Sequence, residues 1–338
     1  MAKREPPLVG KGKTIGHRLR PHRVKLYPSR PLSTSSETAV RERYTAAAQS
    51  REDALCCAVE YEAKYLEAIP KEVIERDYGC GNPSRYVRPN ETVLDLGSGT
   101  GKICFIAAQI VGPKGRVIGV DMTDDMLTLA RDNAPVVAKN IGYHNVEFHK
   151  GRIQDLALDL EQFDKALADH SLSGLEGYLE AEQIAARLRA ESPMIPSNSI
   201  NVIVSNCVLN LIDNATKQQM FAELYRVLKP GGRAIISDIV SSEDVPETMQ
   251  QDSELWSGCI SGSLREDRFI RAFTSNGFDR VCILNRTEKP WRTVQKIDFR
   301  SITIEAVKND ANKKTEANYF MPNININQQS GGCDTGCC

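Results

Sequence analysis

The 338-residue sequence predicts an α/β fold, in which a mostly parallel sheet of seven strands carries helices on both faces. Short apolar runs alternate with longer helical patterns over residues 91–156. The same alternation resumes at residue 200, after a helix-forming insertion at 157–196. A composition of 41% apolar and 26% charged residues is typical of a folded globular protein and excludes disorder of the whole chain.

Charge and cysteine content narrow the function classes further. The formal net charge is −1, from 43 basic and 44 acidic side chains, so nucleic acid is not expected as a partner. No run of 18 apolar residues is present, so no membrane-spanning segment is expected. Ten cysteines are scattered along the chain, unlike those of a small secreted disulfide scaffold, and no signal-peptide core precedes them. We therefore expect a reducing, cytoplasmic location.

The chain divides into four predicted segments. Residues 1–36 are expected to be a disordered basic arm, with an organelle import signal as the alternative. Residues 37–90 are predicted to form an N-terminal element of helices and a loop, which acts as a lid. The main domain is predicted over 91–308. Residues 309–338 are predicted to be a disordered tail that ends in Cys333, Cys337 and Cys338.

The individual elements follow from apolar periodicity and turn residues. Helical spacing covers 37–75, with Pro70 opening a further turn, and a loop rich in glycine follows at 78–83. Thr123 is a predicted N-cap, and Lys-Pro-Gly-Gly at 229–232 is a predicted turn. Helices are expected at 102–111, 123–140, 216–228 and 265–276, and strands at 92–96, 116–120, 145–149, 200–205, 233–240, 281–284 and 299–307.

A glycine-rich turn follows the first predicted strand. Its sequence is Asp95-Leu-Gly-Ser-Gly-Thr-Gly101, and its glycines allow a tight turn and close approach of a ligand to backbone N–H groups. Asp121 ends the second strand twenty residues later, where a carboxylate can accept hydrogen bonds from both ribose hydroxyls. The third glycine follows the second by two positions, so the turn differs from the dinucleotide-binding fingerprint.

This turn resembles the S-adenosylmethionine pocket of Rossmann-like methyltransferases, in which the Lys-Pro-Gly-Gly turn is also common. The resemblance implies S-adenosylmethionine as cofactor, with the residues that follow the third strand beside its adenine. Ordinary turn geometry is the alternative explanation for Gly151, Arg152 and Ile153. The cofactor-binding residues implied are Asp95, Gly97, Ser98, Gly99, Gly101, Asp121, Met122, Arg152, Ile153 and Asn206.

Three cysteines lie in predicted loops. Cys80 lies between two glycines, Cys207 follows the fourth strand, and Cys259 lies in the polar stretch after the fifth. The carboxyl end of the fourth strand is where a doubly wound sheet exposes its substrate site, so we expect Cys207 to face the transferred methyl group. Cys104 and Cys282 are expected to pack in the core, as most thiols do.

Four segments resemble the arsenite S-adenosylmethionine methyltransferase family. They are Tyr-Gly-Cys-Gly, Asp-Leu-Gly-Ser-Gly-Thr-Gly, Ser-Asn-Cys-Val-Leu-Asn-Leu and Ser-Gly-Cys-Ile-Ser-Gly, which occur in this order within residues 37–307. The insertion at 157–196 and the Asn-rich tail depart from the family pattern. The resemblance implies a methyltransferase for arsenic detoxification, which methylates arsenite and then the methylated arsenicals. It further implies that arsenite arrives free or as a thiol conjugate, and that glutathione or thioredoxin is the reductant. A monomer is expected.

The resemblance also assigns roles to the thiols. Cys80, Cys207 and Cys259 would bind trivalent arsenic, with Cys207 and Cys259 holding it throughout and Cys80 needed most for the first transfer. Cys56 or Cys57 is similar to an upstream family cysteine, and either substrate delivery, with Cys57 helping to bind arsenic, or helix packing would explain the pair. The cysteines of the tail would either capture the metalloid or be inert.

The chemistry of arsenic agrees with this set of residues. Thiolates bind trivalent arsenic and leave it a lone pair that carries no proton, so its methylation needs no general base. A compact zinc site is not predicted, because the sequence lacks a Cys-x₂-Cys pair. Two other hypotheses stay open: a methyltransferase with a small organic acceptor, and a thiol-based protein that sequesters a metalloid.

Overall fold

The structure is a computed structural model that describes residues 36–50, 52, 59–168, 170 and 173–310. Nearly all of the predicted basic arm and tail therefore lies outside the described residues, as do Cys56, Cys57 and the three terminal cysteines. None of the helices in the described part of the chain combines the length and the apolar character needed to cross a bilayer.

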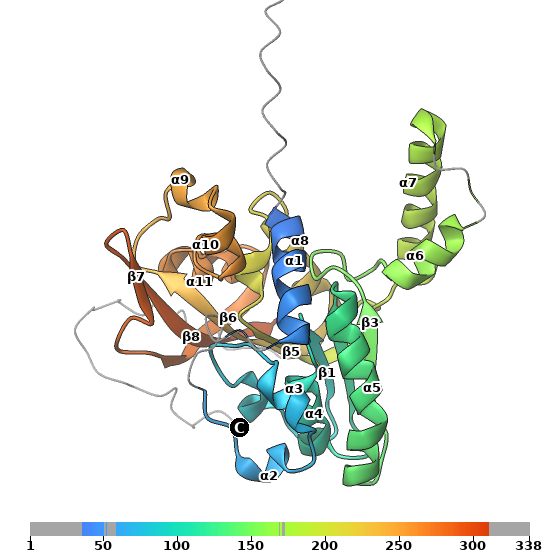
Figure 1. Cartoon of the computed structure of the whole chain (residues 1–338), viewed down its shortest axis with the longest axis horizontal. Helices are drawn as coiled ribbons and strands as arrows, with labels where there is room; N and C mark the ends of the chain where they lie inside the picture. Colours follow the sequence, from blue (N-terminus) through green and yellow to red (C-terminus); the bar gives the residue numbers. More distant parts are fainter. Residues whose placement is uncertain (1–35, 51, 53–58, 169, 171–172, 311–338) are drawn as a thin grey trace, which may run out of the picture. The chain divides into compact units, whose positions relative to one another are not determined.

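A single mixed sheet forms the centre of the fold (Figure 1). Its strand order is β3-β2-β1-β4-β5-β8-β6, with β7 paired to β8. The first five strands of this order are parallel, and β8 and β6 join them in antiparallel pairs. The strands are β1 (Thr92–Leu96), β2 (Arg116–Asp121), β3 (Val146–Lys150), β4 (Ile200–Asn206), β5 (Leu228–Ser241), β6 (Phe278–Arg286), β7 (Arg292–Val294) and β8 (Ile297–Lys308). The predicted α/β fold is confirmed.

Helices cover both faces of the sheet and its carboxyl edge (Figure 1). The α-helices are α1 (Ser36–Gln49), α2 (Ala63–Leu66), α3 (Lys71–Glu75), α4 (Lys102–Val111), α5 (Asp124–Ile141), α6 (Leu160–Leu167), α7 (Gly174–Glu191), α8 (Lys217–Val227), α9 (Glu247–Gln250), α10 (Ser253–Ser257) and α11 (Glu266–Thr274). Two 3₁₀ turns, η2 (Pro83–Tyr86) and η3 (Leu209–Leu211), complete the described elements. Pro70 precedes α3, as predicted.

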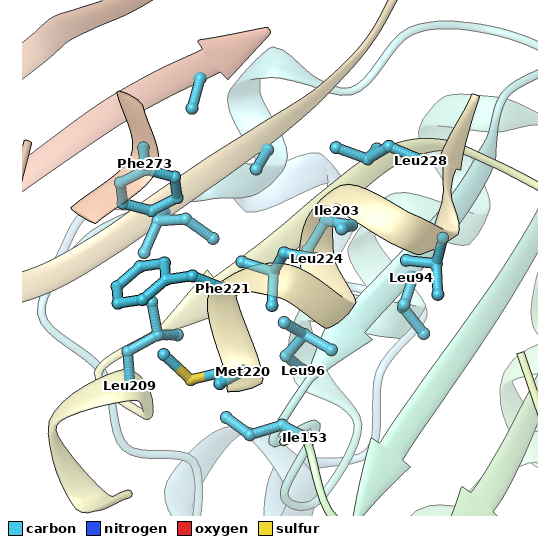
Figure 2. Packing of buried hydrophobic residues seen from close by; sticks show 14 of the residues in the cluster. Leu94, Leu96, Ile153, Ile203, Leu209, Met220, Phe221, Leu224, Leu228 and Phe273 are labelled. Carbon is cyan, nitrogen blue, oxygen red and sulfur yellow. The ribbon is translucent and has the colours of Figure 1, made fainter. Parts of the chain in front are cut away.

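The two faces of the sheet bury alternate residues of the same strands, because successive side chains of a strand point in opposite directions. Leu94 and Leu96 of β1 pack with α8 and α11, as Figure 2 shows for Leu96, Phe221 and Phe273. Val93 packs with α4 and α5 on the opposite face. Asp95 lies two positions after Val93, so its side chain points to the same face of the sheet. Its buried carboxyl there accepts a hydrogen bond from Cys104, just after the turn that follows β1.

Several predicted elements need correction. The Lys-Pro-Gly-Gly segment is a bulge inside β5, because Leu228 pairs with Ile200 and Arg233 with Val202, so four residues of β5 oppose one residue of β4. The polar stretch before residue 265 contains α9 and α10, and the short strand β7 had no sequence signal. Cys282 is only partly buried, because β6 is the outermost strand of the sheet. Thr123 occupies the predicted N-cap position without a side-chain capping bond.

Candidate active site

The main pocket lies where the strand order reverses, at the carboxyl ends of β1 and β4. This is the position at which open α/β sheets bind ligands. The pocket encloses about 860 Å³, open solvent included. Of the predicted cofactor residues, its lining includes Gly97, Gly99, Asp121, Met122, Ile153 and Asn206.

The turn after β1 needs glycine at defined positions. Gly97 has a φ of +65°, and a Cβ there would lie 2.5 Å from a methyl group of Val208. Gly101 has a φ of +89°, and a Cβ there would lie 2.8 Å from the ring of Phe148. Both positions therefore combine a left-handed backbone with a contact that only hydrogen can make. Nothing lies within 4 Å of the Cβ position of Gly99, so the turn is open toward the pocket at this residue.

Asp121 holds this turn from the end of β2. One carboxylate oxygen accepts a hydrogen bond from the N–H of Gly99 at 2.9 Å, and the other accepts one from the N–H of Thr123 at 2.9 Å. Burial raises the pKa of Asp121, and these backbone hydrogen bonds oppose the rise. The carboxylate is thus fixed at the pocket wall, where the sequence predicted a partner for ribose hydroxyls.

Two further acids lie near Asp121: Asp77 lines the pocket and Asp95 is buried outside its lining. Asp95 is 2% exposed, and its carboxyl accepts a hydrogen bond from the Cys104 thiol at 3.2 Å. Burial, aided by the nearby charges of Asp77 and Asp121, raises the pKa of Asp95 to about 8, against the effect of that hydrogen bond. Asp77 forms a buried ion pair with Lys102 at 2.6 Å. Burial therefore favours the neutral form of Asp95, while the charge of Asp77 is paired with that of Lys102.

The remaining predicted cofactor residues, Asp95, Ser98, Gly101 and Arg152, do not line the pocket. Ser98 is buried, and its hydroxyl has no hydrogen-bond partner within the described part of the chain. The Arg152 guanidinium does not line the pocket and pairs with Glu37 of α1 at 2.5 Å. The thiol of Cys104 is fully buried, as predicted for a core residue, although it also donates to Asp95.

Helix α1 packs between α5 and α10 and covers the pocket (Figure 1). Glu37, Val40 and Tyr44 of this helix line the cavity. The hydroxyl of Ser36 at its start donates to Asp213, beyond β4. The described part of α1 therefore forms one wall of the pocket, and its action as a lid stays a prediction. Periodicity predicted the helix, but no motif marked these three side chains as pocket residues.

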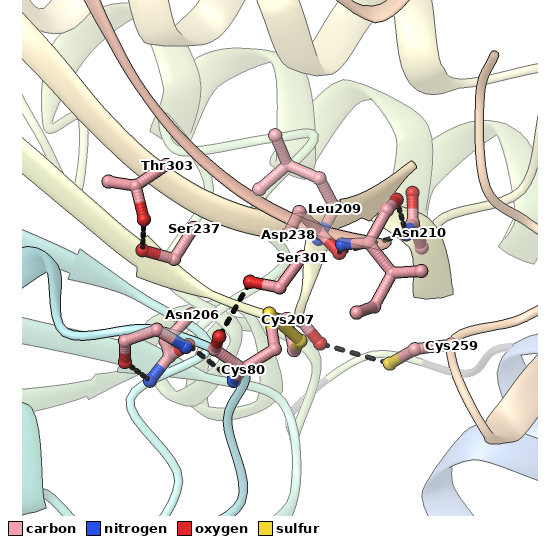
Figure 3. Close-up of a disulfide and its surroundings, with 12 residues drawn as sticks. Cys80, Asn206, Cys207, Leu209, Asn210, Ser237, Asp238, Cys259, Ser301 and Thr303 are labelled. Carbon is pink, nitrogen blue, oxygen red and sulfur yellow. Dashed lines mark hydrogen bonds between the residues drawn. A yellow bond between two sulfur atoms is a disulfide. The ribbon is translucent and has the colours of Figure 1, made fainter. Parts of the chain in front are cut away.

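The three predicted loop cysteines converge beside this pocket (Figure 3). Cys80 and Cys207, 127 positions apart in the chain, are joined by a disulfide, and their Cα atoms are 5.9 Å apart. The thiol of Cys259 donates a hydrogen bond to the carbonyl oxygen of Cys207 at 3.1 Å. Cys207 lines the main pocket itself, so the sulfur cluster adjoins the cofactor crevice.

Asn206 fixes the loop that carries Cys80. Its side-chain oxygen accepts hydrogen bonds from the N–H groups of Cys80 and Gly81, at 2.9 and 3.0 Å, and its amide donates to the Gly81 carbonyl at 2.8 Å. The hydroxyl of Ser301 donates to the Cys80 carbonyl at 2.6 Å (Figure 3). A Cβ at Gly79 would lie 2.1 Å from the Asn206 amide, which explains a glycine beside Cys80. Asn206, predicted to bind cofactor, thus also positions a thiol.

Both Cys207 and Cys259 have left-handed backbones, with φ of 60° and 59°. This conformation is uncommon outside glycine and costs on the order of 1 kcal/mol per residue, and such strain gathers at functional sites. Val208, the residue after Cys207, lines the main pocket, and Cys259 lines a second one. A second, smaller pocket adjoins Cys207 and Cys259, and its lining consists of Tyr44, Tyr78, Cys207, Ile239, Gly258, Cys259 and Trp291.

Comparison with known proteins agrees with the geometry of the pocket. A family model described as a methyltransferase domain matches residues 88–190 and 182–277, which together cover more than half of the chain. The crystal structure of an arsenic(III) S-adenosylmethionine methyltransferase from Chlamydomonas reinhardtii matches this fold with a TM-score of 0.58. The two sequences are 30% identical, and the match covers 73% of each chain. The chain belongs to the arsenic(III) S-adenosylmethionine methyltransferase family.

Curated members of this family extend the comparison. The arsenite methyltransferase of Halobacterium salinarum is 36% identical over 272 residues, which make up 74% of this chain and 59% of that protein. The arsenite methyltransferase of Mus musculus is 34% identical over 206 residues, 60% of this chain and 45% of that protein. The chain therefore spans about half the length of the curated relatives that it matches.

The pocket fits the cofactor of this methyltransferase family. S-adenosylmethionine has a cationic sulfonium and an ammonium group, and the carboxyl groups of Asp77 and Asp121 line the crevice as possible acceptors for them. The open space at the Cβ position of Gly99 would let the cofactor approach the turn closely, and the Asp121 carboxylate would accept from its ribose.

Replacement of Gly97 by alanine is expected to weaken S-adenosylmethionine binding by about tenfold or more, because the new methyl group would displace Val208 beside Cys207. Gly112→Ala is the matched control, since Gly112 also has a positive φ of 71° but nothing lies within 4 Å of its Cβ position. Calorimetric titration should show the control within about twofold of the wild type. Equal affinities in the two variants would contradict this account of the turn.

Replacement of Asp95 by asparagine is expected to flatten the pH dependence of stability in the cofactor-free protein. Because the pKa of Asp95 is raised to about 8, its contribution to the free energy of unfolding is complete below pH 4 and is lost as the pH rises toward 8. In the wild type, the free energy of unfolding should decline by about 1 kcal/mol per pH unit between pH 5 and 8, and the variant should lack this decline. Urea unfolding at four pH values measures this. Parallel curves for wild type and variant would refute it, and Asp132→Asn, on the exposed side of α5, is the control.

Proposed function

We propose that this protein methylates trivalent arsenic, taking arsenite to methylated arsenicals with methyl groups from S-adenosylmethionine. The observation that carries the proposal is the convergence of Cys80, Cys207 and Cys259 at the wall of the cofactor pocket. The sulfurs come from three loops of the described chain that are distant in sequence. An acceptor with carbon or oxygen as its nucleophile would have no use for such a cluster.

The chemistry of arsenic(III) explains why sulfur would be the ligand. Trivalent arsenic is thiophilic, and three thiolates would hold it as a pyramidal centre with a lone pair directed away from them. When bound, S-adenosylmethionine would supply an electrophilic methyl group: the lone pair would form the As–C bond, S-adenosylhomocysteine would leave, and no proton would be released. Arsenic would rise from the +3 to the +5 state, so each further transfer would need two electrons from the thiol reductant. The site therefore needs to orient the acceptor and exclude water, and it does not need a general base.

The thiols must be reduced and ionised before they bind arsenic. The Cys80–Cys207 disulfide has no thiol to offer, so the binding-competent state requires two electrons and two protons from a thiol reductant. We propose glutathione or thioredoxin for this step. Ionising a thiol with an ordinary pKa near ~8.5 costs about 2 kcal/mol at pH 7, which several arsenic–sulfur bonds should exceed.

The three thiols would have different roles. Cys207 and Cys259 are joined through the Cys207 carbonyl and would hold arsenic throughout. Cys80 reaches the site on a separate loop, fixed by Asn206 and Ser301, and would be needed most for the first transfer. Cys57, outside the described residues, would assist substrate delivery. We propose that the enzyme acts as a monomer in the cytoplasm.

Cys207→Ser is expected to lower the yield of methylarsenicals from arsenite by about 100-fold or more, because arsenic loses the sulfur nearest the cofactor pocket. Cys282→Ser, on the outermost strand, is the matched control and should retain wild-type yield. Product analysis by chromatography with arsenic detection measures both, in the presence of excess thiol and S-adenosylmethionine.

Three results would contradict the proposal. If the Cys207→Ser variant retained the wild-type yield, the thiol would have no role in the reaction. If the wild-type protein bound S-adenosylmethionine but formed no methylarsenical, an organic acceptor would replace arsenic as the substrate. A wild-type protein that bound arsenite but not S-adenosylmethionine would point instead to sequestration.

A further inference from the structure

A buried polar network joins the loop of Cys207 to the loop of Cys259 (Figure 3). Its centre is Asp238 of β5, whose side chain is fully buried. One carboxyl oxygen accepts a hydrogen bond from the N–H of Leu209 at 2.9 Å. The other accepts from the side-chain amide of Asn210 at 2.8 Å and from the N–H of Ile239 at 2.8 Å. Every group that touches this carboxyl is a donor.

Asn210 carries the network to the second loop. Its amide nitrogen has two hydrogens for three acceptors: Asp238, the Ile239 carbonyl at 2.6 Å, and the Ser263 hydroxyl at 3.3 Å, which shares a hydrogen with one of the others. The Ser263 hydroxyl in turn donates to the carbonyl of Cys259 at 3.1 Å. A chain of three side chains therefore connects the end of β5 to the backbone of Cys259, and each of its atoms is buried.

Two more contacts tie the same loops together. The Lys217 ammonium donates to the carbonyl of Gly262, and the indole N–H of Trp256 donates to the carbonyl of Leu211 at 3.1 Å. The side chain of Leu209 is buried in the core beside α8 (Figure 2). Core packing therefore also holds the loop of Cys207. Leu209 thus has both its side chain and its N–H fixed, two positions after Cys207.

We propose that Asp238 is a positioning residue for arsenic capture, which sets the separation of Cys207 and Cys259 through Asn210 and Ser263. This inference rests on the proposed function, because arsenic is the ligand that needs two sulfurs at one distance. Both cysteines have left-handed backbones, and such strain persists only where surrounding contacts over-determine it. The hydrogen bonds to Leu209 and to the Cys259 carbonyl are contacts of that kind.

Burial and hydrogen bonding act on the charge of Asp238 in opposite directions. Burial raises the pKa of Asp238 to about 7, and its hydrogen bonds with Lys217 nearby oppose that rise. Burial lowers the pKa of Lys217 to about 8, against the charges of Asp238 and Asp213. Because only donors face the carboxyl, an amide at residue 238 would place its own N–H₂ against another donor in either orientation.

The test compares Asp238→Asn with Asp244→Asn in the full chain, reduced and then freed of reductant. Asp244 follows on the same segment, pairs with Arg265 and Arg268 and has a half-exposed side chain, so this variant controls for loss of one negative charge. Dibromobimane, which cross-links two neighbouring thiols, followed by peptide mass mapping, reports whether Cys207 and Cys259 remain within reach of one bridge.

We expect the Cys207–Cys259 cross-link to fall by about tenfold in Asp238→Asn and to persist in Asp244→Asn. The KM for arsenite should rise by about tenfold in Asp238→Asn while the KM for S-adenosylmethionine stays within about twofold, a split that general destabilisation would not produce. Ser263→Ala removes only the last link to Cys259 and should lower the cross-link by about threefold.

Wild-type cross-linking and arsenite KM in a folded Asp238→Asn protein would overturn the proposal. If that variant does not fold, an unchanged cross-link in Ser263→Ala overturns it instead. The cross-linking result decides the positioning role without any methylation of arsenite, so failure of the proposed function would be recognised separately, by the absence of methylated product from the wild-type protein.

Discussion

Buried hydrogen bonds at the carboxyl ends of β4 and β5 hold the three cysteine loops against one another. Asn206, the last residue of β4, fixes the backbone of Cys80, while Asp238 of β5 fixes the turn that follows Cys207. Both side chains belong to neighbouring parallel strands, so the sheet itself sets the positions from which the loops depart. Strand pairing therefore determines where the three cysteines lie, as the loops do.

The same edge of the sheet also carries the cofactor crevice. Gly97 approaches Val208 so closely that a side chain cannot fit between them, and Val208 follows Cys207 directly. The two sites thus share a wall, and α1 lies over both, with Val40 in the larger cavity and Tyr44 in each. Methyl donor and thiol-bound acceptor would meet in a space closed by one helix, which favours orientation and exclusion of water.

The sequence predicted seven of the eight described strands and placed Cys80, Cys207 and Cys259 in loops, because short apolar runs and glycine turns are local signals. It missed what depends on pairing: the Pro-Gly-Gly bulge within β5, the edge position of Cys282, and the side chains of α1 in the pocket. The hydrogen-bond network around Asp238 was also not predicted, since a single buried acid in a strand has no local sequence signal. Arg152, predicted near adenine, pairs with Glu37, a partner 115 positions away.

Arsenic-edge X-ray absorption of the reduced protein with bound arsenite would test the central claim most directly. The measurement uses a variant that retains Cys80, Cys104, Cys207 and Cys259, with serine at the other six cysteines, so that the core thiol is undisturbed. The account predicts three sulfur neighbours around arsenic, and two when Cys80 is also replaced. Oxygen neighbours in place of sulfur, or three sulfurs that persist after replacement of Cys207, would contradict it.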